Sequence, residues 1–558
     1  MFATCISFHT YRERLDQCYP LGVNNTRHSV NLYRCNDSHE GWCKIAEIIY
    51  DPVYRYILWI LLIVLVSSGA LVVDTMRRLS RVLRIIAYVL VWLVIVAGYL
   101  LNTWIIYIDS LQGLFLILCS IAGIAISLYS EGYLRVLFGK IQHLQLIIDM
   151  TLLLILMLFT ARNLLEFTVL WISIELVAFL LILLERGLEN WSVGLKYLVV
   201  CVTAGDISLF SWIAITATTI GINKALLTDF QILMNSTINV TNPVLTFLVL
   251  VGFLAKLGQI PFHIWLVDTY SEAPSPITAI FSGLMSKMSI YAILRVLSLL
   301  DLNNMVYLIT LLALGFITTI YASIMASAQT DVKKMIAYSS MTHYGVMTML
   351  LGLLVFDERI TGLVYLYVFY HGLLKTHVFL NIASIELLTN TRDIYRLGYL
   401  AKVARRLYDK ILYTILSLMG LPPTIGFIAK ALVIYIALIL ASQGIPYAFV
   451  FLVGVIISSI FSIVYSVKYL GVYVGTYANI PFRPSIMLDS TQYVMEYTLS
   501  LLMIIIPLPF LLIIQGDAIT YMIYGFYIVT IIAVLAAKMF HKKIVIYETP
   551  TWVGGVET

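Results

Sequence analysis

The sequence predicts an all-α polytopic membrane protein, and three observations lead to this fold class. Hydrophobic residues make up 61% of the 558 residues and charged residues only 12%, and a soluble fold of this length does not bury so much apolar surface. Apolar stretches of roughly the 20 residues that a bilayer requires recur along the chain. Two of these stretches are broken by proline, one at Pro261 and one at Pro422 and Pro423. We therefore expect a bundle of transmembrane helices, two of which are interrupted.

The bilayer length, applied to each apolar stretch, gives about fifteen transmembrane helices. They are expected near residues 56–73, 85–107, 111–129, 144–160, 165–184, 194–220, 244–266, 276–299, 304–328, 334–356, 361–387, 411–441, 446–474, 497–515 and 519–538. Backbone groups that a break leaves without helical partners cannot face lipid. Each break must therefore lie inside protein or line a cavity.

Basic residues set the expected orientation, because lysine and arginine are enriched in loops on the inner side of a membrane. Basic residues follow the first, third, ninth, eleventh and last spans, and these loops share one side if the N-terminus is outside and the C-terminus inside. The opposite loops at 108–110, 300–303, 357–360 and 442–445 together carry one basic residue, Arg359. The basic residues in these loops account for the net charge of +5, so no nucleic acid partner is expected.

Residues 1–50 are polar and are expected to form an external head. They lack the apolar region of about 7–15 residues that marks a signal peptide. The head contains Cys5, Cys18, Cys35 and Cys43. Four cysteines on the oxidising face of a membrane predict two disulfides, with three connectivities open. Free thiols are one alternative, and a zinc site with His9, His28 or His39 is the other, although no C-x-x-C spacing supports it.

Charged residues inside apolar spans are the strongest functional signal that the residues themselves give. Glu175 lies in the middle of a span, Lys256 precedes the break at Pro261, and Lys287 lies near the middle of the next span. A lysine at membrane depth costs about 2.5–3.5 kcal/mol on insertion scales. A broken helix with buried lysines is the layout of an ion path. The alternative is a buried ion pair that only fixes packing.

The stretch from Phe253 to Arg295 resembles a known family. It is similar to the signature of the antiporter-like membrane subunits of respiratory complex I, of hydrogenase-4-type energy-converting hydrogenases and of multi-subunit sodium/proton antiporters. The matching residues, in order, are Lys256, Pro261, His263, Trp265, Leu266, Asp268, Ala273, Pro274, Ser275, Pro276 and Ala279. The resemblance covers roughly residues 85–480 and implies two inverted repeats of five helices, each with one broken helix.

The resemblance also implies roles for residues of the first repeat. A family glutamate that pairs with the lysine of the broken helix maps onto Glu175 and Lys256, and the central family lysine maps onto Lys287. Asp206 matches an acidic family position. His263 would relay protons toward Lys256, and a structural histidine is the alternative.

The second repeat carries a matching set. His343 follows the motif that begins at Asp331, and Lys430 follows the second break in the pattern P-P-x-x-G-F-x-x-K. His371 and Lys375 are four residues apart and therefore share a helix face. Where relatives have a second histidine, this chain has Tyr367.

These residues are expected to form one coupled row that conducts protons. Burial disfavours a charged lysine and a nearby carboxylate favours it, so movement of Glu175 would change how tightly Lys256 holds a proton. The energy for proton transport must come from partner subunits, because the chain has no phosphate-binding, haem or iron–sulfur motif. For the same reason, no cofactor is expected in this chain. The expected partners are other membrane subunits, a peripheral redox arm and the lipid bilayer.

Three functions follow as alternatives. The first is a proton-translocating subunit of a redox complex of the NADH:quinone oxidoreductase or hydrogenase type. The second is a subunit of a multi-subunit Na⁺/H⁺ antiporter, and the third is a scaffold that does not transport. Neighbouring genes for iron–sulfur or nickel–iron subunits would favour the first, and small antiporter subunits the second. We expect a prokaryotic cell membrane rather than a mitochondrial inner membrane.

The expected organisation has five regions. They are the external head 1–50, the N-terminal helices 51–143, the first antiporter-like repeat 144–299, the second antiporter-like repeat 300–474, and the C-terminal helices with a cytoplasmic tail 475–558.

Overall fold

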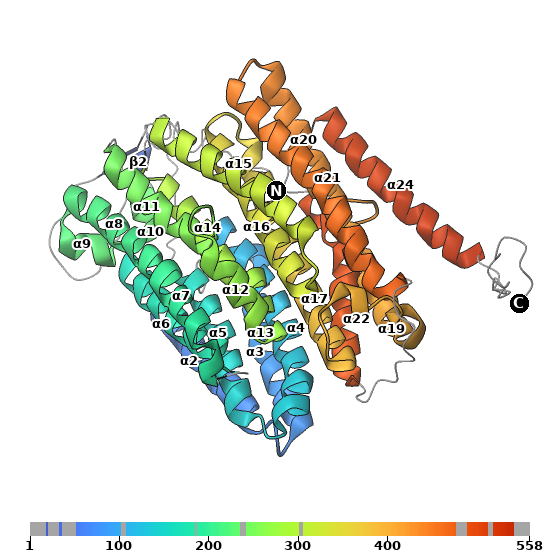
Figure 1. Ribbon diagram of the computed structural model, residues 1–558. Helices are drawn as coiled ribbons and strands as arrows, with labels where there is room; N and C mark the ends of the chain where they lie inside the picture. The colour runs from blue at the N-terminus through green and yellow to red at the C-terminus, as the bar shows by residue number, and fades with distance from the viewer. Residues whose placement is uncertain are drawn as a thin grey trace, which may run out of the picture.

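The computed structural model describes residues 18–20, 33–35, 52–101, 108–184, 187–234, 242–300, 305–475, 488–511 and 517–540. These residues form a helical bundle, with one short strand pair in the N-terminal head (Figure 1). The predicted polytopic helical membrane fold is confirmed. Within these described ranges, thirteen helices, some formed from consecutive segments, are long and apolar enough to cross a membrane.

The helices follow one another along the chain with short connections. The N-terminal part contains α2 (Pro52–Leu71), α3 (Arg77–Leu101), α4 (Ser110–Phe138) and α5 (Gln142–Thr160). The next part contains α6 (Leu164–Ile182), η2 (Gly187–Asn190), α7 (Trp191–Lys196), η3 (Tyr197–Val202), α8 (Thr203–Ile220), α9 (Ile222–Leu227), α10 (Phe230–Met234), α11 (Pro243–Lys256), α12 (Ile264–Glu272), α13 (Ser275–Ile280), η4 (Phe281–Met285) and α14 (Ser286–Leu297).

The second half of the chain lies on the other side of the bundle in Figure 1, in yellow-green to red. It contains α15 (Met305–Ala328), α16 (Val332–Gly352), η5 (Leu353–Val355), α17 (Arg359–Thr389), η6 (Ile394–Arg396), α18 (Leu400–Val403), α19 (Arg405–Met419), α20 (Ile425–Ser442), α21 (Pro446–Val474), α22 (Ser490–Ile505), α23 (Pro507–Phe510) and α24 (Ala518–Phe540). The last of these, α24, extends away from the bundle (Figure 1).

Two of the fifteen expected spans, α11 and α16, are not among the thirteen long apolar helices. The first is short because it ends at the break after Lys256. The second carries many polar residues, including Lys333 and His343, and nearly all of it is buried in protein. The exact number of spans, the two repeats and the five regions therefore stay predictions.

Both broken helices have their free backbone groups paired inside the protein. At the first break, Gly258 adopts φ +64° and Ile260 N donates to Thr318 Oγ1 at 2.9 Å. The side chain of Trp265 donates to the carbonyl of Ala255 at 3.0 Å. At the second break, Gly420 adopts φ +83° and Gly426 N donates to Ser417 Oγ at 3.2 Å. These contacts satisfy the requirement that irregular backbone at membrane depth be buried in protein.

The centre of the bundle is formed by α13, η4 and α14 together with α17, whose residues are nearly all buried. Two of the described segments are π-helical: η3 immediately precedes α8, and η4 immediately precedes α14. Such π-helical turns are often found at functional sites. Here η4 ends two residues before Lys287, so a π-helical turn adjoins a buried lysine.

The head contains the strands β1 (Cys18–Pro20) and β2 (Tyr33–Cys35), which pair antiparallel with Cys18 and Cys35 in register. This pairing was not expected from the sequence. Cys5 and Cys43 lie outside the described residues, and the two disulfides stay a prediction.

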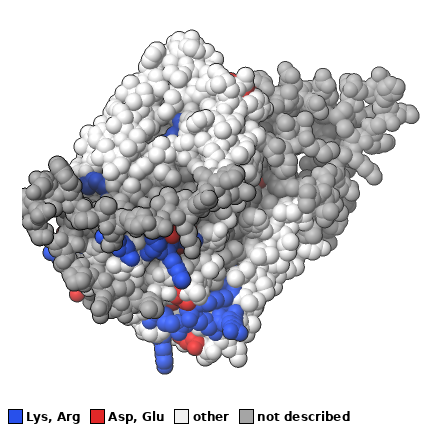
Figure 2. Space-filling view, turned by 90° about the vertical axis from the view of Figure 1, so that its right-hand side faces the viewer, with Lys and Arg blue, Asp and Glu red and all other residues white. Residues whose placement is uncertain are grey.

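The arginines after the first span do not lie in a loop, as the sequence analysis assumed. Residues 77–84 form the first two turns of α3 instead. Arg84 is buried and donates to Glu131 of α4 at 2.6 Å. Figure 2 shows lysine and arginine side chains gathered, with acidic ones among them, in the lower part of one face, while the described upper part carries few charges. An apolar belt with charges at one end is consistent with a membrane-spanning bundle.

A close contact between α8 and α11 makes the fold testable at Gly252. A methyl group added at this residue would lie 1.9 Å from the carbonyl oxygen of Ala204. We expect Gly252→Ala to lower the Tm of the purified complex clearly, because overpacking costs roughly 1–3 kcal/mol or more. Gly525→Ala on α24 is the matched control, since nothing lies within 4 Å of its added methyl group. Equal Tm values for the two variants would contradict this packing.

Candidate ion-translocation site

The first element of the site is a buried ion pair between α6 and α11. Lys256 Nζ donates to Glu175 Oε1 at 2.7 Å, and both side chains are almost inaccessible to solvent. The ammonium group also lies 4.8 Å from the ring of Trp171, a cation–π contact. Lys256 is the last residue of α11, so the break places its ammonium where the helix ends. The structure thus brings together the pair that the resemblance implied.

This pair is embedded in a polar setting that is not fully satisfied. Glu175 Oε2, Trp171 Nε1 and Asp206 Oδ1 are buried without a hydrogen-bond partner. Gly205 leaves room for the carboxylate, because a methyl group there would lie 3.0 Å from Glu175 Oε1. Buried polar groups without partners are rare and point to a functional arrangement. The carboxylate therefore has free acceptor capacity on the side away from Lys256.

Asp206 and His263 lie at the margin of the pair. Asp206 is half-buried on α8 and acts electrostatically on Lys256. His263 immediately precedes α12, and its ring packs 5.1 Å from that of Tyr321. In the described residues no hydrogen bond joins His263 to Lys256.

A small, mainly apolar pocket adjoins the pair. Its lining includes Lys256, Tyr197, Cys201 and Tyr270, and also Ser286, the residue before Lys287.

The second buried lysine is Lys287 of α14. Its Nζ donates to Ser286 Oγ at 3.0 Å and to the carbonyl of Ser282 at 2.8 Å. It also lies 2.5 Å from Nδ1 of His371 on α17. No carboxylate forms an ion pair with this lysine among the described residues. The contact joins an amine on α14 to an imidazole on α17, and both of these groups can bind protons.

His371 continues into a cluster of rings. Its ring lies 5.4 Å from that of His343 on α16 and 4.9 Å from that of Tyr344. His343 Nδ1 pairs with the hydroxyl of Tyr367 at 2.8 Å. The tyrosine that replaces the second family histidine thus binds a histidine of the row. Nε2 of each histidine is buried without a partner.

Lys375 and Lys430 complete the row, each held by neutral oxygen atoms. Lys375 is fully buried and donates to the hydroxyl of Ser339 and to the carbonyl of Ile336. Lys430 donates to Ser462 Oγ at 2.5 Å and to the carbonyl of Leu418 at 2.7 Å. Within the described part of the chain, no hydrogen bond joins the two lysines.

Sequence reasoning missed several buried pairs of ionisable residues, three of which are named here. His377 on α17 binds Glu496 on α22, Arg84 binds Glu131, and Arg295 binds Asp109. Glu496 and Glu131 each lie in or beside an apolar span, and this signal was available. The partners of Glu496 and Glu131 could not be predicted, because contacts between distant helices leave no periodic pattern in the sequence.

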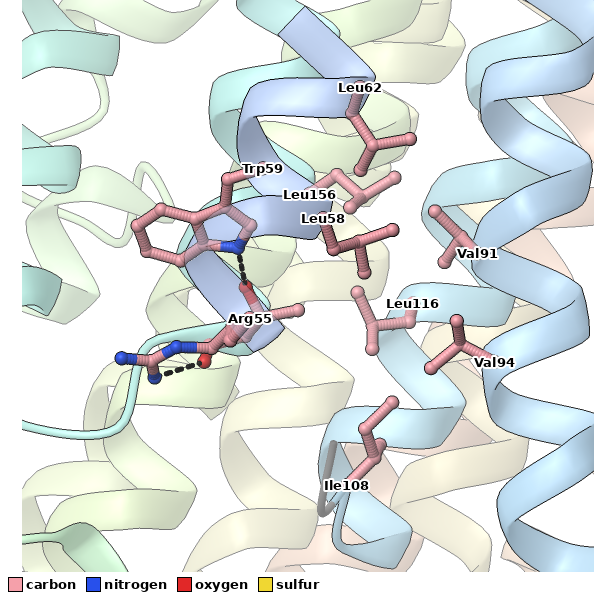
Figure 3. A pocket seen from close by; sticks show the side chains of 10 residues that line it. Arg55, Leu58, Trp59, Leu62, Val91, Val94, Ile108, Leu116 and Leu156 are labelled. Atoms are coloured by element: carbon pink, nitrogen blue, oxygen red, sulfur yellow. Dashed lines mark hydrogen bonds between the residues drawn. The ribbon is translucent and has the colours of Figure 1, made fainter. Parts of the chain in front are cut away.

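A second pocket lies apart from the row (Figure 3). It is formed between α2, α3, α4 and α5 and is mainly apolar, with side chains such as Leu58, Val91 and Leu116. Its polar edge is already occupied, since Trp59 Nε1 donates to Thr160 Oγ1 at 2.9 Å. It therefore offers packing space rather than a step for ions.

The fold and the buried charges define a polytopic membrane protein with a polar interior. The chain belongs to the family described as "NADH:quinone oxidoreductase/Mrp antiporter, TM", whose model matches residues 161–459, more than half of the chain. The matched segment includes every residue of the row from Glu175 to Lys430. The resemblance read from the sequence is confirmed.

Three known proteins show the breadth of this similarity. NADH-quinone oxidoreductase subunit M of Rickettsia typhi is 35% identical over 191 residues, 34% of this chain and 38% of that subunit. A hydrogenase-4 component F homologue of Methylacidiphilum infernorum is 32% identical over 188 residues, 33% of this chain and 39% of that protein. A chain of the Mrp complex from Dietzia sp. shares the fold, with a TM-score of 0.65 and 18% identity over 82% of this chain and 96% of that one. This chain thus aligns with well under half the length of the two curated relatives.

Proposed function

We propose that this chain is a proton-translocating membrane subunit of a redox-driven complex of the NADH:quinone oxidoreductase or hydrogenase type. The observation that carries the proposal is a set of buried ionisable side chains: the Glu175–Lys256 pair, Lys287 in contact with His371, and Lys430, which is held by neutral oxygen atoms. Buried ionisable residues inside a membrane mark ion pathways. The similarity to NADH-quinone oxidoreductase subunit M and to a hydrogenase-4 component supports the same reading.

The chemistry of the row favours protons over sodium. Lysine and histidine nitrogens bind and release protons, whereas hard metal cations prefer oxygen ligands such as carboxylates and carbonyls. Among the described side chains of the row, Lys287, Lys375 and Lys430 have no carboxylate partner. A sodium ion would meet cationic ammonium groups there. The donor set therefore suits stepwise proton transfer.

In the proposed cycle, the carboxylate of Glu175 holds a proton on Lys256 by compensating its charge. When Glu175 moves away, a charged ammonium in an apolar setting is costly, and the proton passes across the pocket toward Ser286 and Lys287. Lys287 hands it to Nδ1 of His371, with which it is in hydrogen-bond contact. Partner subunits, including a peripheral redox arm, drive the movement of Glu175. We place the complex in a prokaryotic cell membrane with the N-terminus of this chain outside.

The alternative is a subunit of a multi-subunit Na⁺/H⁺ antiporter. The family description and the fold shared with a chain of the Mrp complex favour this second candidate. The two differ in what energises transport and in which ion moves.

One experiment separates them. The complex is purified through this chain, its subunits are identified, and it is reconstituted into sealed proteoliposomes with a pH-sensitive dye. We expect reduced donor and quinone to drive dye-detected proton movement in sodium-free buffer. Proton movement that needs an imposed sodium gradient and ignores redox turnover would overturn the redox proposal and support the antiporter.

A further inference from the structure

A second buried acid–base pair lies outside the row described above. Nε2 of His377 on α17 is 2.8 Å from Oε2 of Glu496 on α22, and neither side chain reaches solvent. The family model ends at residue 459, so Glu496 is a feature of this chain beyond the matched segment. The pair therefore needs its own explanation.

The pair sits on a second polar face of α17. His371 and Lys375 point toward α14 and α16, where their hydrogen-bond partners lie. His377, Asn381 and Ser384 are spaced by four and three residues and so share a different face. That face meets α19, α22 and α4 through hydrogen bonds. One central helix thus carries two separate polar lines.

Neutral groups surround Glu496. Its oxygens accept from Ser384 Oγ at 3.1 Å and from Asn381 Nδ2 at 3.3 Å. Among the described residues no lysine or arginine forms an ion pair with it. Tyrosines on neighbouring elements, Tyr129, Tyr469, Tyr473 and Tyr493, interact electrostatically with Glu496. The contact between His377 and Glu496 thus joins a proton-binding nitrogen to a proton-binding oxygen inside the bundle.

The other side of the imidazole leads toward the second break. Nδ1 of His377 lies 2.6 Å from Thr414 Oγ1 on α19. One turn further along α19, the carbonyl of Leu418 accepts from Lys430 Nζ at 2.7 Å. Thr414 and Leu418 are four residues apart and so lie on the same side of α19. The partner atoms of His377 and of Lys430 thus lie one turn apart on α19.

From this geometry we propose that His377 and Glu496 form an additional proton-binding site that supplies Lys430 along α19. The proposal rests on the proposed function. On release, the O–H bond of the Glu496 acid breaks as an N–H bond forms at Nε2 of His377, and the N–H bond at Nδ1 breaks as its proton leaves on the side of Thr414. On uptake, the next proton re-forms the N–H bond at Nδ1, the N–H bond at Nε2 breaks, and the O–H bond of Glu496 forms again. No electron moves, and the only species that enters and leaves is a proton.

The test compares Glu496→Gln with Glu496→Asp in the reconstituted whole complex. Glutamine keeps the shape and the hydrogen bonds but cannot exchange a proton, so we expect pumping to fall about tenfold or more, as for loss of a positioned acid. Aspartate keeps an acid and should restore much of the pumping. Thr498→Val on the exposed side of α22 is the control and should pump normally. Normal pumping by Glu496→Gln, or equal loss in the Gln and Asp variants, would reduce the pair to a packing role and overturn the proposal.

A chemical measurement tests the proton site at Glu496 independently of the proposed proton-translocating function. N,N′-Dicyclohexylcarbodiimide adds to protonated carboxyl groups in apolar surroundings, and mass spectrometry locates the adduct. We expect an adduct on Glu496 even if the wild-type complex pumps no protons. Wild-type complex without pumping would refute the proposed function alone. Absence of the adduct at every pH would refute the proton site alone.

Discussion

Glu175→Gln should reduce proton pumping to roughly a hundredth of the wild-type rate or less, on the scale of losing a positioned proton-transfer group. Glutamine fills the same space but carries no charge to compensate Lys256, whose ammonium lies 2.7 Å from the carboxylate. Lys256→Ala should have the same effect, because it removes the group that takes up the proton. The measurement is dye-detected proton uptake by proteoliposomes, with redox turnover recorded in parallel.

Stability must be separated from transport in this experiment. Removal of one partner of a buried ion pair costs about 3–5 kcal/mol, because the other charge is left alone. The double variant Glu175→Gln/Lys256→Met leaves neither charge, so it should assemble at least as well as either single variant and still not pump. Phe262→Leu, close to the break, is the control that should pump nearly normally. A double variant that regains pumping would show that the pair serves packing only.

The second large effect is expected at the contact between the two halves of the row. Lys287→Met keeps the length of the side chain but removes the proton carrier that touches His371 at 2.5 Å. We expect pumping to fall about a hundredfold, again because a positioned acid–base group is lost. Met288→Leu is a neighbouring, buried and nearly isosteric control that should cost little. Pumping by Lys287→Met above half of the wild-type rate would mean that protons bypass α14.

Local patterns in the sequence predicted much of the fold. Hydrophobic stretches of bilayer length placed the helices, and the prolines at 261 and 422–423 placed both breaks. The pairing of Glu175 with Lys256 came from the family resemblance, and the structure brings these two side chains together. These features are local or carried by a motif, so a single sequence reveals them.

Contacts between distant segments could not be predicted in the same way. Lys287 and His371 are separated by 84 residues, and His377 and Glu496 by 119. Helix periodicity gives the face of each residue but not which helix lies opposite. Arg84 was misread because a run of arginines near a span end looks like a loop, whereas helix α3 starts early and turns this side chain toward Glu131. Tyr367 was read as a missing or weaker member of the row, and its hydroxyl pairs with His343.

The central claim is that Lys256 must bind and release a proton, and Lys256→Arg tests it most directly. Arginine keeps the positive charge beside Glu175 but does not release its proton at any working pH. Proton uptake is measured in proteoliposomes that contain the whole complex, at matched redox turnover. The account predicts that Lys256→Arg pumps as poorly as Lys256→Ala while assembling better. Wild-type pumping by Lys256→Arg would contradict the account, because the position would then serve only as a fixed charge.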